Sequence, residues 1–142
     1  MKGQFILGGI GIVGSFIASL FGGWSDGLTI LCIFMVIDFI TGMTAAAMGE
    51  SEKSPNGGIS SQVIWKGILK KLMTLVLVVV GAQLDRLTGA NYIRDTVVIA
   101  YCIAEVVSII ENAGLIGLPV PSIIQKVIDV LKEQNNNTDF KE

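Results

Sequence analysis

Three acidic residues, Asp38, Glu105 and Glu111, lie inside long apolar stretches of this 142-residue chain. A charged side chain at the centre of a lipid bilayer costs about 3 kcal/mol, so an acid at that depth has a structural or functional reason to be there. The carboxyl groups could be protonated, form hydrogen bonds between helices, or face water in a pore or cavity. We expect no lysine or arginine at the same depth, and therefore no buried ion pair.

Polar and small residues accompany these acids at helical spacing. After Asp38, Thr41 and Gly42 continue along the same side of a helix. A second polar stripe follows steps of four, three and four along an otherwise apolar helix: Tyr101, Glu105, Ser108 and Asn112. The simplest role of these residues is a hydrogen bond between an acid and a neighbouring hydroxyl. The stripes favour contact with water in a pore, and a proton relay is the third interpretation.

Several classes of function are excluded by what the chain lacks. It has no histidine, which excludes histidine-based acid–base catalysis and metal binding. Cys32 and Cys102 both lie in apolar stretches, where a cysteine usually acts as a small apolar side chain. The formal charge of −2 argues against a nucleic-acid partner. Because motifs for a nucleophile, a phosphate loop or a metal are also missing, we expect no enzyme, no cofactor and no bound metal.

The elements that carry these residues are long apolar segments. Of the residues, 51% are hydrophobic and 15% are charged, against roughly 25% charged in a soluble domain. A bilayer core of about 30 Å needs about 20 apolar helical residues. Four apolar segments approach this length, at about residues 5–21, 28–48, 66–84 and 96–118. We therefore predict an all-α integral membrane bundle of about four transmembrane helices, with three also possible.

The predicted single membrane domain covers residues 1–133. Pro119 and Pro121 end the last span. An amphipathic helix over about 122–133 follows, either on the membrane surface or docked on the bundle. Residues 134–142 have no apolar period, so we expect a disordered cytoplasmic tail.

The first apolar segment carries small residues in two adjacent helical rows. One row contains Gly14, Ala18 and Gly22, and the other contains Gly11, Ser15 and Ser19. Small residues four apart let helix backbones approach closely in lipid. We expect a helix-packing face here, and its partner is either another helix of the same chain or a second copy.

The third span is short, since its uncharged part covers only residues 72–84. It crosses a bilayer only if Lys70 and Lys71 extend towards the headgroups. With four spans, eight of the ten basic residues lie on one side of the membrane, and Arg86 and Arg94 lie on the other. The positive-inside rule then places both termini in the cytoplasm. With three spans the first segment lies in the interface, and only one basic residue changes side.

Four short motifs occur in a fixed order along the chain: Asp38-Phe39-Ile40-Thr41-Gly42, then Lys53-Ser54 with Gly57-Gly58-Ile59 and Lys66-Gly67, then the run from Glu105 to Gly114, and then Gly117-Leu118-Pro119-Val120-Pro121. The first is similar to the D-x-x-T-G motif, and the third to the E-x-x-S-I-x-E-N-x-G motif, of phage holins of the toxin-secretion/phage-lysis type. Each motif is weak alone, and their order is the stronger signal. The resemblance covers about residues 28–133.

This resemblance implies a small protein that accumulates in the host cytoplasmic membrane, in contact with lipid, and forms homo-oligomers. At a set time it opens lesions through which a cell-wall hydrolase (an endolysin), or in some relatives a toxin, leaves the cell. The acids and polar stripes, Glu111 included, would then lie at helix contacts or face a pore. Two other classes stay open: a small proton- or cation-coupled channel or transporter subunit with Asp38 and Glu105 as ion ligands, and a non-conducting assembly factor.

Overall fold

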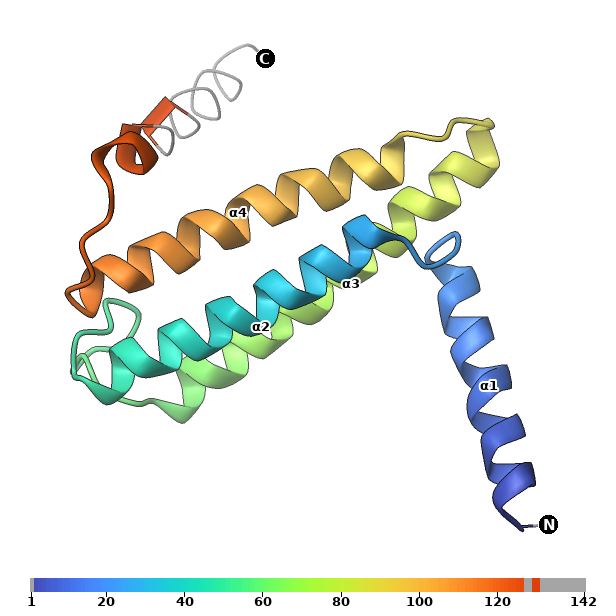
Figure 1. Ribbon diagram of the computed structural model, residues 1–142, viewed down its shortest axis with the longest axis horizontal. Helices are drawn as coiled ribbons and strands as arrows, with labels where there is room; N and C mark the ends of the chain where they lie inside the picture. The colour runs from blue at the N-terminus through green and yellow to red at the C-terminus, as the bar shows by residue number, and fades with distance from the viewer. Residues whose placement is uncertain (1, 127–128, 131–142) are drawn as a thin grey trace.

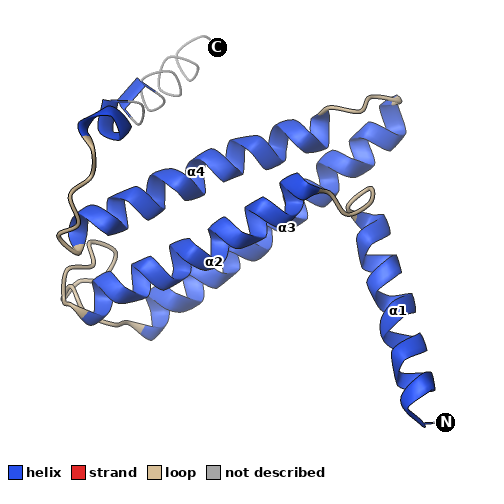
Figure 2. Ribbon diagram, viewed as in Figure 1, coloured by secondary structure: helices blue, strands red, loops and turns tan. Residues whose placement is uncertain are grey.

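The protein is an assembly of long helices. The computed structural model describes residues 2–126 and 129–130, and within these residues no strand occurs. The four long helices are α1 (Lys2–Leu20), α2 (Asp26–Ala47), α3 (Ser61–Thr88) and α4 (Ile93–Leu115), as Figures 1 and 2 show. The prediction of an all-α chain is confirmed for the described residues.

Helices α2, α3 and α4 form a three-helix bundle in which α4 is central. α4 packs closely along both α2 and α3, whereas the backbones of α2 and α3 come close to each other at few positions. Gly81 of α3 permits one close approach, because a Cβ there would lie only 3.1 Å from the Cα of Arg94 in α4. Because glycine has no side chain, the end of α3 and the start of α4 can come together at this position.

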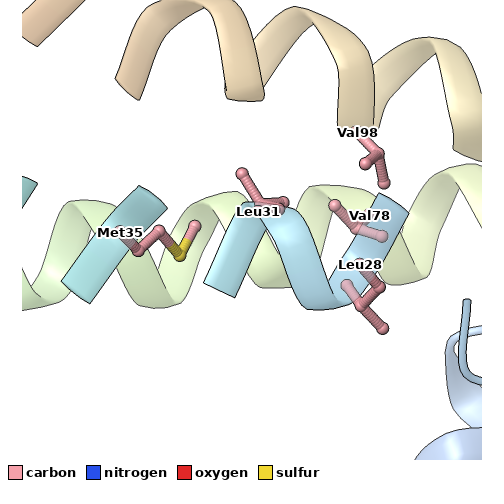
Figure 3. Close-up of a cluster of buried hydrophobic side chains, with 5 residues drawn as sticks. All are labelled: Leu28, Leu31, Met35, Val78 and Val98. Carbon is pink, nitrogen blue, oxygen red and sulfur yellow. The ribbon is translucent and has the colours of Figure 1, made fainter. Parts of the chain in front are cut away.

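A small apolar core joins the three helices (Figure 3). Its side chains are at most 6% exposed and come from all three helices: Leu28, Leu31 and Met35 of α2, Val78 of α3 and Val98 of α4. Full burial of a side chain of this size stabilises the fold by about 1.5–3 kcal/mol. The core occupies the half of the bundle nearest to α1. On α2, Asp38 follows Met35 by about one turn.

Helix α1 points away from the bundle, and the C-terminal end of α1 contacts it (Figure 1). Three side chains of α3 and α4 donate hydrogen bonds to backbone carbonyls there: Gln83 to Leu20 (2.8 Å), Arg86 to Ser19 (2.6 Å) and Arg94 to Phe21 (3.1 Å). Carbonyls at the end of a helix have no partner within it, so α3 and α4 complete the end of α1. The structure thus shows three helices bundled and α1 attached at one end; it does not confirm a bundle of four.

Some helices extend past the predicted spans, because the predictions stopped where the apolar residues stop, and one helix ends earlier than predicted. Helix α3 extends beyond 66–84 at both ends, and it continues until Gly89 adopts a left-handed φ of 73°. That conformation ends helices and is easily reached by glycine. Helix α4 ends at Leu115, ahead of the predicted 118, and Gly117 follows with a φ of 80°.

Helix α2 is the one helix among the described residues that is both long and apolar enough to cross a membrane. Its mean hydropathy is 2.1 over the most apolar window. The apolar stretch Ile6–Leu20 is shorter than a span requires. Helices α3 and α4 have 28 and 23 residues, so their length suffices, but length and composition together do not establish four spans.

The predicted amphipathic helix falls only partly within the described residues. Residues 122–126 and 129–130 are helical. The rest of the predicted range, 127–128 and 131–133, lies outside the described residues, and so does the predicted tail at 134–142.

Candidate functional site

One lysine joins the two acids at the centre of the predicted site. Lys71 Nζ of α3 lies 2.9 Å from Oδ2 of Asp38 in α2 and 2.5 Å from Oε2 of Glu105 in α4. The three side chains are 19%, 13% and 12% exposed, respectively. A single ammonium group therefore connects all three helices of the bundle. We call Asp38, Lys71 and Glu105 the ion network.

The expectation that no lysine reaches the depth of the acids was wrong. Lys70 is exposed, as predicted for a side chain that extends outwards, but Lys71 turns into the bundle. Burial of a carboxylate is unfavourable unless an opposite charge and hydrogen bonds compensate for it, and Lys71 supplies both. Spacing in the sequence does not separate the two lysines, because Lys71 precedes the buried Thr74 by three residues and Lys70 precedes it by four.

Asn112 of α4 completes the hydrogen bonding of Asp38. Its Nδ2 donates to Asp38 Oδ1 at 3.0 Å and to Thr41 Oγ1 at 3.1 Å, and the residue is only 4% exposed. Gly42 makes room for this contact, because a Cβ at that position would lie 3.4 Å from Nδ2 of Asn112. Thr41 Oγ1 in turn donates to the backbone carbonyl of Asp38 at 3.1 Å. Sequence spacing had predicted all four of these residues for the site, and the structure brings them together.

The other predicted residues lie around this centre. Ser108 Oγ receives a hydrogen bond of 3.4 Å from Nζ of Lys53, which belongs to the loop between α2 and α3. Tyr101 packs against the apolar core. Glu111 is exposed and lines a cavity beside the network. The sequence reasoning missed Lys53 as well as Lys71, since a lysine in a loop has no helical period that would place it.

The site is a closed network in this conformation. Among the described residues, no buried side-chain nitrogen or oxygen lacks a hydrogen-bond partner. In the same part of the chain, no three acidic or cysteine side chains group in a way that could hold a metal ion. The two carboxylates of the network bind the ammonium of Lys71, which leaves the network with one formal negative charge. The arrangement therefore links the three helices by charge.

A cavity of about 140 Å³ borders the network on its loop side. Residues of all three bundled helices line it, Asp38, Gly42, Lys71 and Asn112 among them. Apolar residues of α2 and α3, such as Phe39 and Ile64, line it as well. The cavity therefore places room for water next to charges that are otherwise packed in protein.

The predicted helix-packing residues of α1 find few neighbours in the structure. A Cβ at Gly11 or Gly14 would meet nothing within 4 Å, whereas one at Gly22 would lie 3.4 Å from Ala82. Ser15 and Ser19 are exposed and Ala18 is half-buried. Among the described residues, the rows of small residues thus meet the bundle only at the end of α1, and a contact with another copy stays a prediction.

Comparison with known proteins finds a family pattern and relatives that cover most of the chain. The pattern of the bacteriophage holin family matches residues 15–133, which include every member of the ion network. An uncharacterized protein of Listeria innocua is 32% identical over 136 residues, covering 93% of this chain and 91% of its own. An uncharacterized protein of Halalkalibacterium halodurans is 32% identical over 127 residues, covering 85% and 89%.

A phage protein is among the more distant relatives. The probable holin of Bacillus phage phi105 is 25% identical over 116 residues, which are 81% of each chain. No solved structure matches the chain. Because the family pattern covers most of the chain and the relatives align over nearly their full lengths, this protein belongs to the bacteriophage holin family.

Proposed function

We propose that this protein is a holin: it oligomerises in the bacterial cytoplasmic membrane and forms lesions that release a cell-wall hydrolase, or a toxin, and so cause timed lysis. Family membership supports a bacterial membrane protein that associates with its own copies. The observation that carries the mechanism is the ion network, in which charged side chains of three helices are turned inwards in an otherwise apolar bundle.

The network gives the bundle two states with different surfaces. While Lys71 binds both acids, each helix presents mainly apolar side chains to its surroundings, among them Val36 of α2 and Leu72 of α3, which are 58% and 53% exposed. If the helices separate in an oligomer, the same acids and the lysine become the lining of a hydrated surface. A cooperative exchange of ion pairs for water is a two-state change, which suits an event that happens abruptly.

The proposed topology has four spans with both termini in the cytoplasm. The loop between α2 and α3, with Lys53, Lys66 and Lys70 nearby, is then cytoplasmic. Arg86 and Arg94 lie on the other side, where both bind backbone carbonyls at the end of α1. Because these two arginines bind backbone carbonyls, their presence on this side has a structural reason. They therefore do not argue against the excess of basic residues on the cytoplasmic side.

Induced expression in a bacterial host tests the proposal. The protein is expressed together with a cytoplasmic wall hydrolase that has no export signal, and optical density, membrane potential and release of a cytoplasmic enzyme are followed. A holin produces sudden depolarisation followed by lysis, and lysis needs both proteins. If expression of the wild-type protein never depolarises the membrane, the proposal is wrong.

The same experiment separates the alternative, a small proton- or cation-coupled channel or transporter subunit. The acids at Asp38 and Glu105 are the feature that such a protein would use. It would change the membrane potential without releasing the hydrolase. Depolarisation without lysis in the presence of the hydrolase would therefore favour the ion-coupled alternative.

A further inference from the structure

The loop that connects α2 to α3 closes on itself. Its backbone makes internal hydrogen bonds, from Ser51 N to the carbonyl of Gly57 at 2.9 Å and from Gly57 N to the carbonyl of Ser54 at 3.1 Å. Gly49 and Gly57 at its base both have positive φ, of 80° and 70°. A Cβ on Gly57 would collide with the carbonyl group of Gly49. Residues 49–60, the connecting loop, therefore form a compact unit with a narrow base.

The connecting loop forms one wall of the cavity beside the ion network. Six of its residues line the cavity: Ser51, Glu52, Lys53, Gly58, Ile59 and Ser60. Asp38, Lys71 and Asn112 line the same cavity. The cavity of about 140 Å³ exceeds the roughly 10–15 Å³ that one water molecule needs. The loop thus stands between the aqueous phase and a chamber next to the charges that hold the helices together.

Lys53 fixes this loop to the bundle. Its Nζ donates to Ser108 Oγ of α4 at 3.4 Å, across a sequence distance of 55 residues. Ser108 lies one turn from Glu105 on α4, so the ammonium of Lys53 sits beside a network with one formal negative charge. Charge attraction and the hydrogen bond both favour the closed position.

We propose that the connecting loop is a lid, that Lys53 holds it closed against Ser108, and that its opening admits water to the ion network before the helices separate. Water weakens the attraction between Lys71 and its two acids by roughly a factor of four relative to a protein interior, since the effective dielectric constant rises from about 20 to about 80. The link between lid opening and lesion formation rests on the holin function proposed above. The closed lid itself does not.

Access to the cavity measures the lid without any assay of lysis. Ala46 lines the cavity, so Ala46→Cys is made with Cys32→Ala and Cys102→Ala in the full-length protein. The purified protein in detergent micelles is reacted with iodoacetamide. This reagent is uncharged, so the loss of a nearby positive charge does not by itself attract it. The rate of alkylation at position 46 reports how often the lid is open.

Lys53→Gln should raise this rate by about threefold, the change expected from the loss of one exposed charged contact. Lys53→Arg should keep the rate near that of the parent. Lys66→Gln removes the same charge from α3 outside the cavity lining, and should leave the rate unchanged. Equal rates for Lys53→Gln and its parent, or an equal increase with Lys66→Gln, would overturn the proposal.

A second reporter guards against a variant that simply unfolds. The background for this reporter keeps the native, half-buried Cys32 and the native Ala46, and carries Cys102→Ala. In this background, Lys53→Gln should leave the alkylation of Cys32 slow. An equal rise at Cys32 means that the whole bundle has loosened, and it rejects the lid.

Lysis timing then tests the link to function. In the induced host, Lys53→Gln should shorten the time to depolarisation, and Lys66→Gln should not. An open lid with unchanged timing would reject the link while the lid stands. A wild-type protein that never depolarises the membrane would reject the holin function and leave the alkylation result intact.

Discussion

Lys71 Nζ lies 2.9 Å from Oδ2 of Asp38, and this ion pair bridges two helices whose backbones rarely come close, α3 and α2. The side chain of Lys71 thus provides a direct contact between α2 and α3 where their backbones are not closely packed. Its second partner, Glu105 at 2.5 Å, extends the bridge to α4. The ion network is therefore expected to be decisive for how the three helices stay together.

Replacing Lys71 by methionine should destabilise the bundle by about 3 kcal/mol, because two carboxylates are left in the interior without a counter-charge. Chemical unfolding of the purified protein in detergent, followed by circular dichroism, measures this change. The triple variant Lys71→Met/Asp38→Asn/Glu105→Gln removes all three charges and should recover much of the loss.

Lys70→Met is the matched control, because Lys70 precedes Lys71 directly but is exposed. It should change the free energy of unfolding by less than about 0.5 kcal/mol. Equal effects of the two substitutions would mean that the ion network contributes nothing specific to the fold.

Much of this site could be predicted from helical spacing. Asp38, Thr41 and Gly42 share a side of α2, and Glu105, Ser108 and Asn112 share a side of α4, so the two stripes face each other once the helices pack. Spacing within one helix cannot say which other helix supplies the counter-charge. If every lysine next to an apolar run is taken to extend outwards, Lys71 is assigned to the wrong environment.

The position of α1 was beyond prediction for a different reason. The rows at Gly11 and Gly14 indicate a packing face, but they carry no information about which surface covers it. The contacts that hold α1 come from long polar side chains of the other helices, such as Arg94, and bind backbone carbonyls. Every residue has a backbone carbonyl, so no sequence pattern indicates which carbonyls will accept these hydrogen bonds.

Arg94 should fix the turn after α1. Its Nη1 donates to the carbonyls of Phe21, Gly22 and Gly23 at 3.1, 3.3 and 3.2 Å. In Arg94→Met these carbonyls lose a charged donor, and the amide of Gly23, bonded to the carbonyl of Ala18, should exchange with deuterium about tenfold faster. Hydrogen exchange with mass spectrometry measures it. Lys66→Met at the opposite end of the bundle should leave this exchange unchanged, and an unchanged rate in Arg94→Met would contradict the prediction.

Asp85, just outside the predicted span at 66–84, should make the start of α4 sensitive to acid. Its carboxylate accepts hydrogen bonds from the backbone amides of Ile93 and Arg94, both at 2.9 Å. Desolvation raises the pKa of Asp85, but these amides and the charge of Arg94 outweigh it, so the pKa lies below its ordinary value. The contribution to stability is thus complete above the ordinary pKa and is lost as the pH falls through the lower pKa of the folded protein.

The difference in melting temperature between the wild type and Asp85→Asn measures this contribution. It should be largest near about pH 6 and should shrink as the pH is lowered below about 4, because the wild-type carboxyl group is then progressively protonated. A difference that stays constant over this range, or grows on acidification, would show that the carboxylate does not cap α4.

Gly14 tests whether the small residues of α1 form a contact between copies. A Cβ there would meet nothing within 4 Å in the single chain, so Gly14→Leu should leave the free energy of unfolding of the bundle unchanged. If a second copy packs on this row, the bulky side chain separates the helices, and the association constant should fall about fivefold, or about 1 kcal/mol. Energy transfer between labelled copies in lipid vesicles measures the association.

Gly9→Leu is the matched control, because Gly9 is equally uncovered but lies on the opposite side of α1 from the two rows. A loss of association in both variants would show a general effect of bulk on α1, and no loss in Gly14→Leu would remove the packing role from this face.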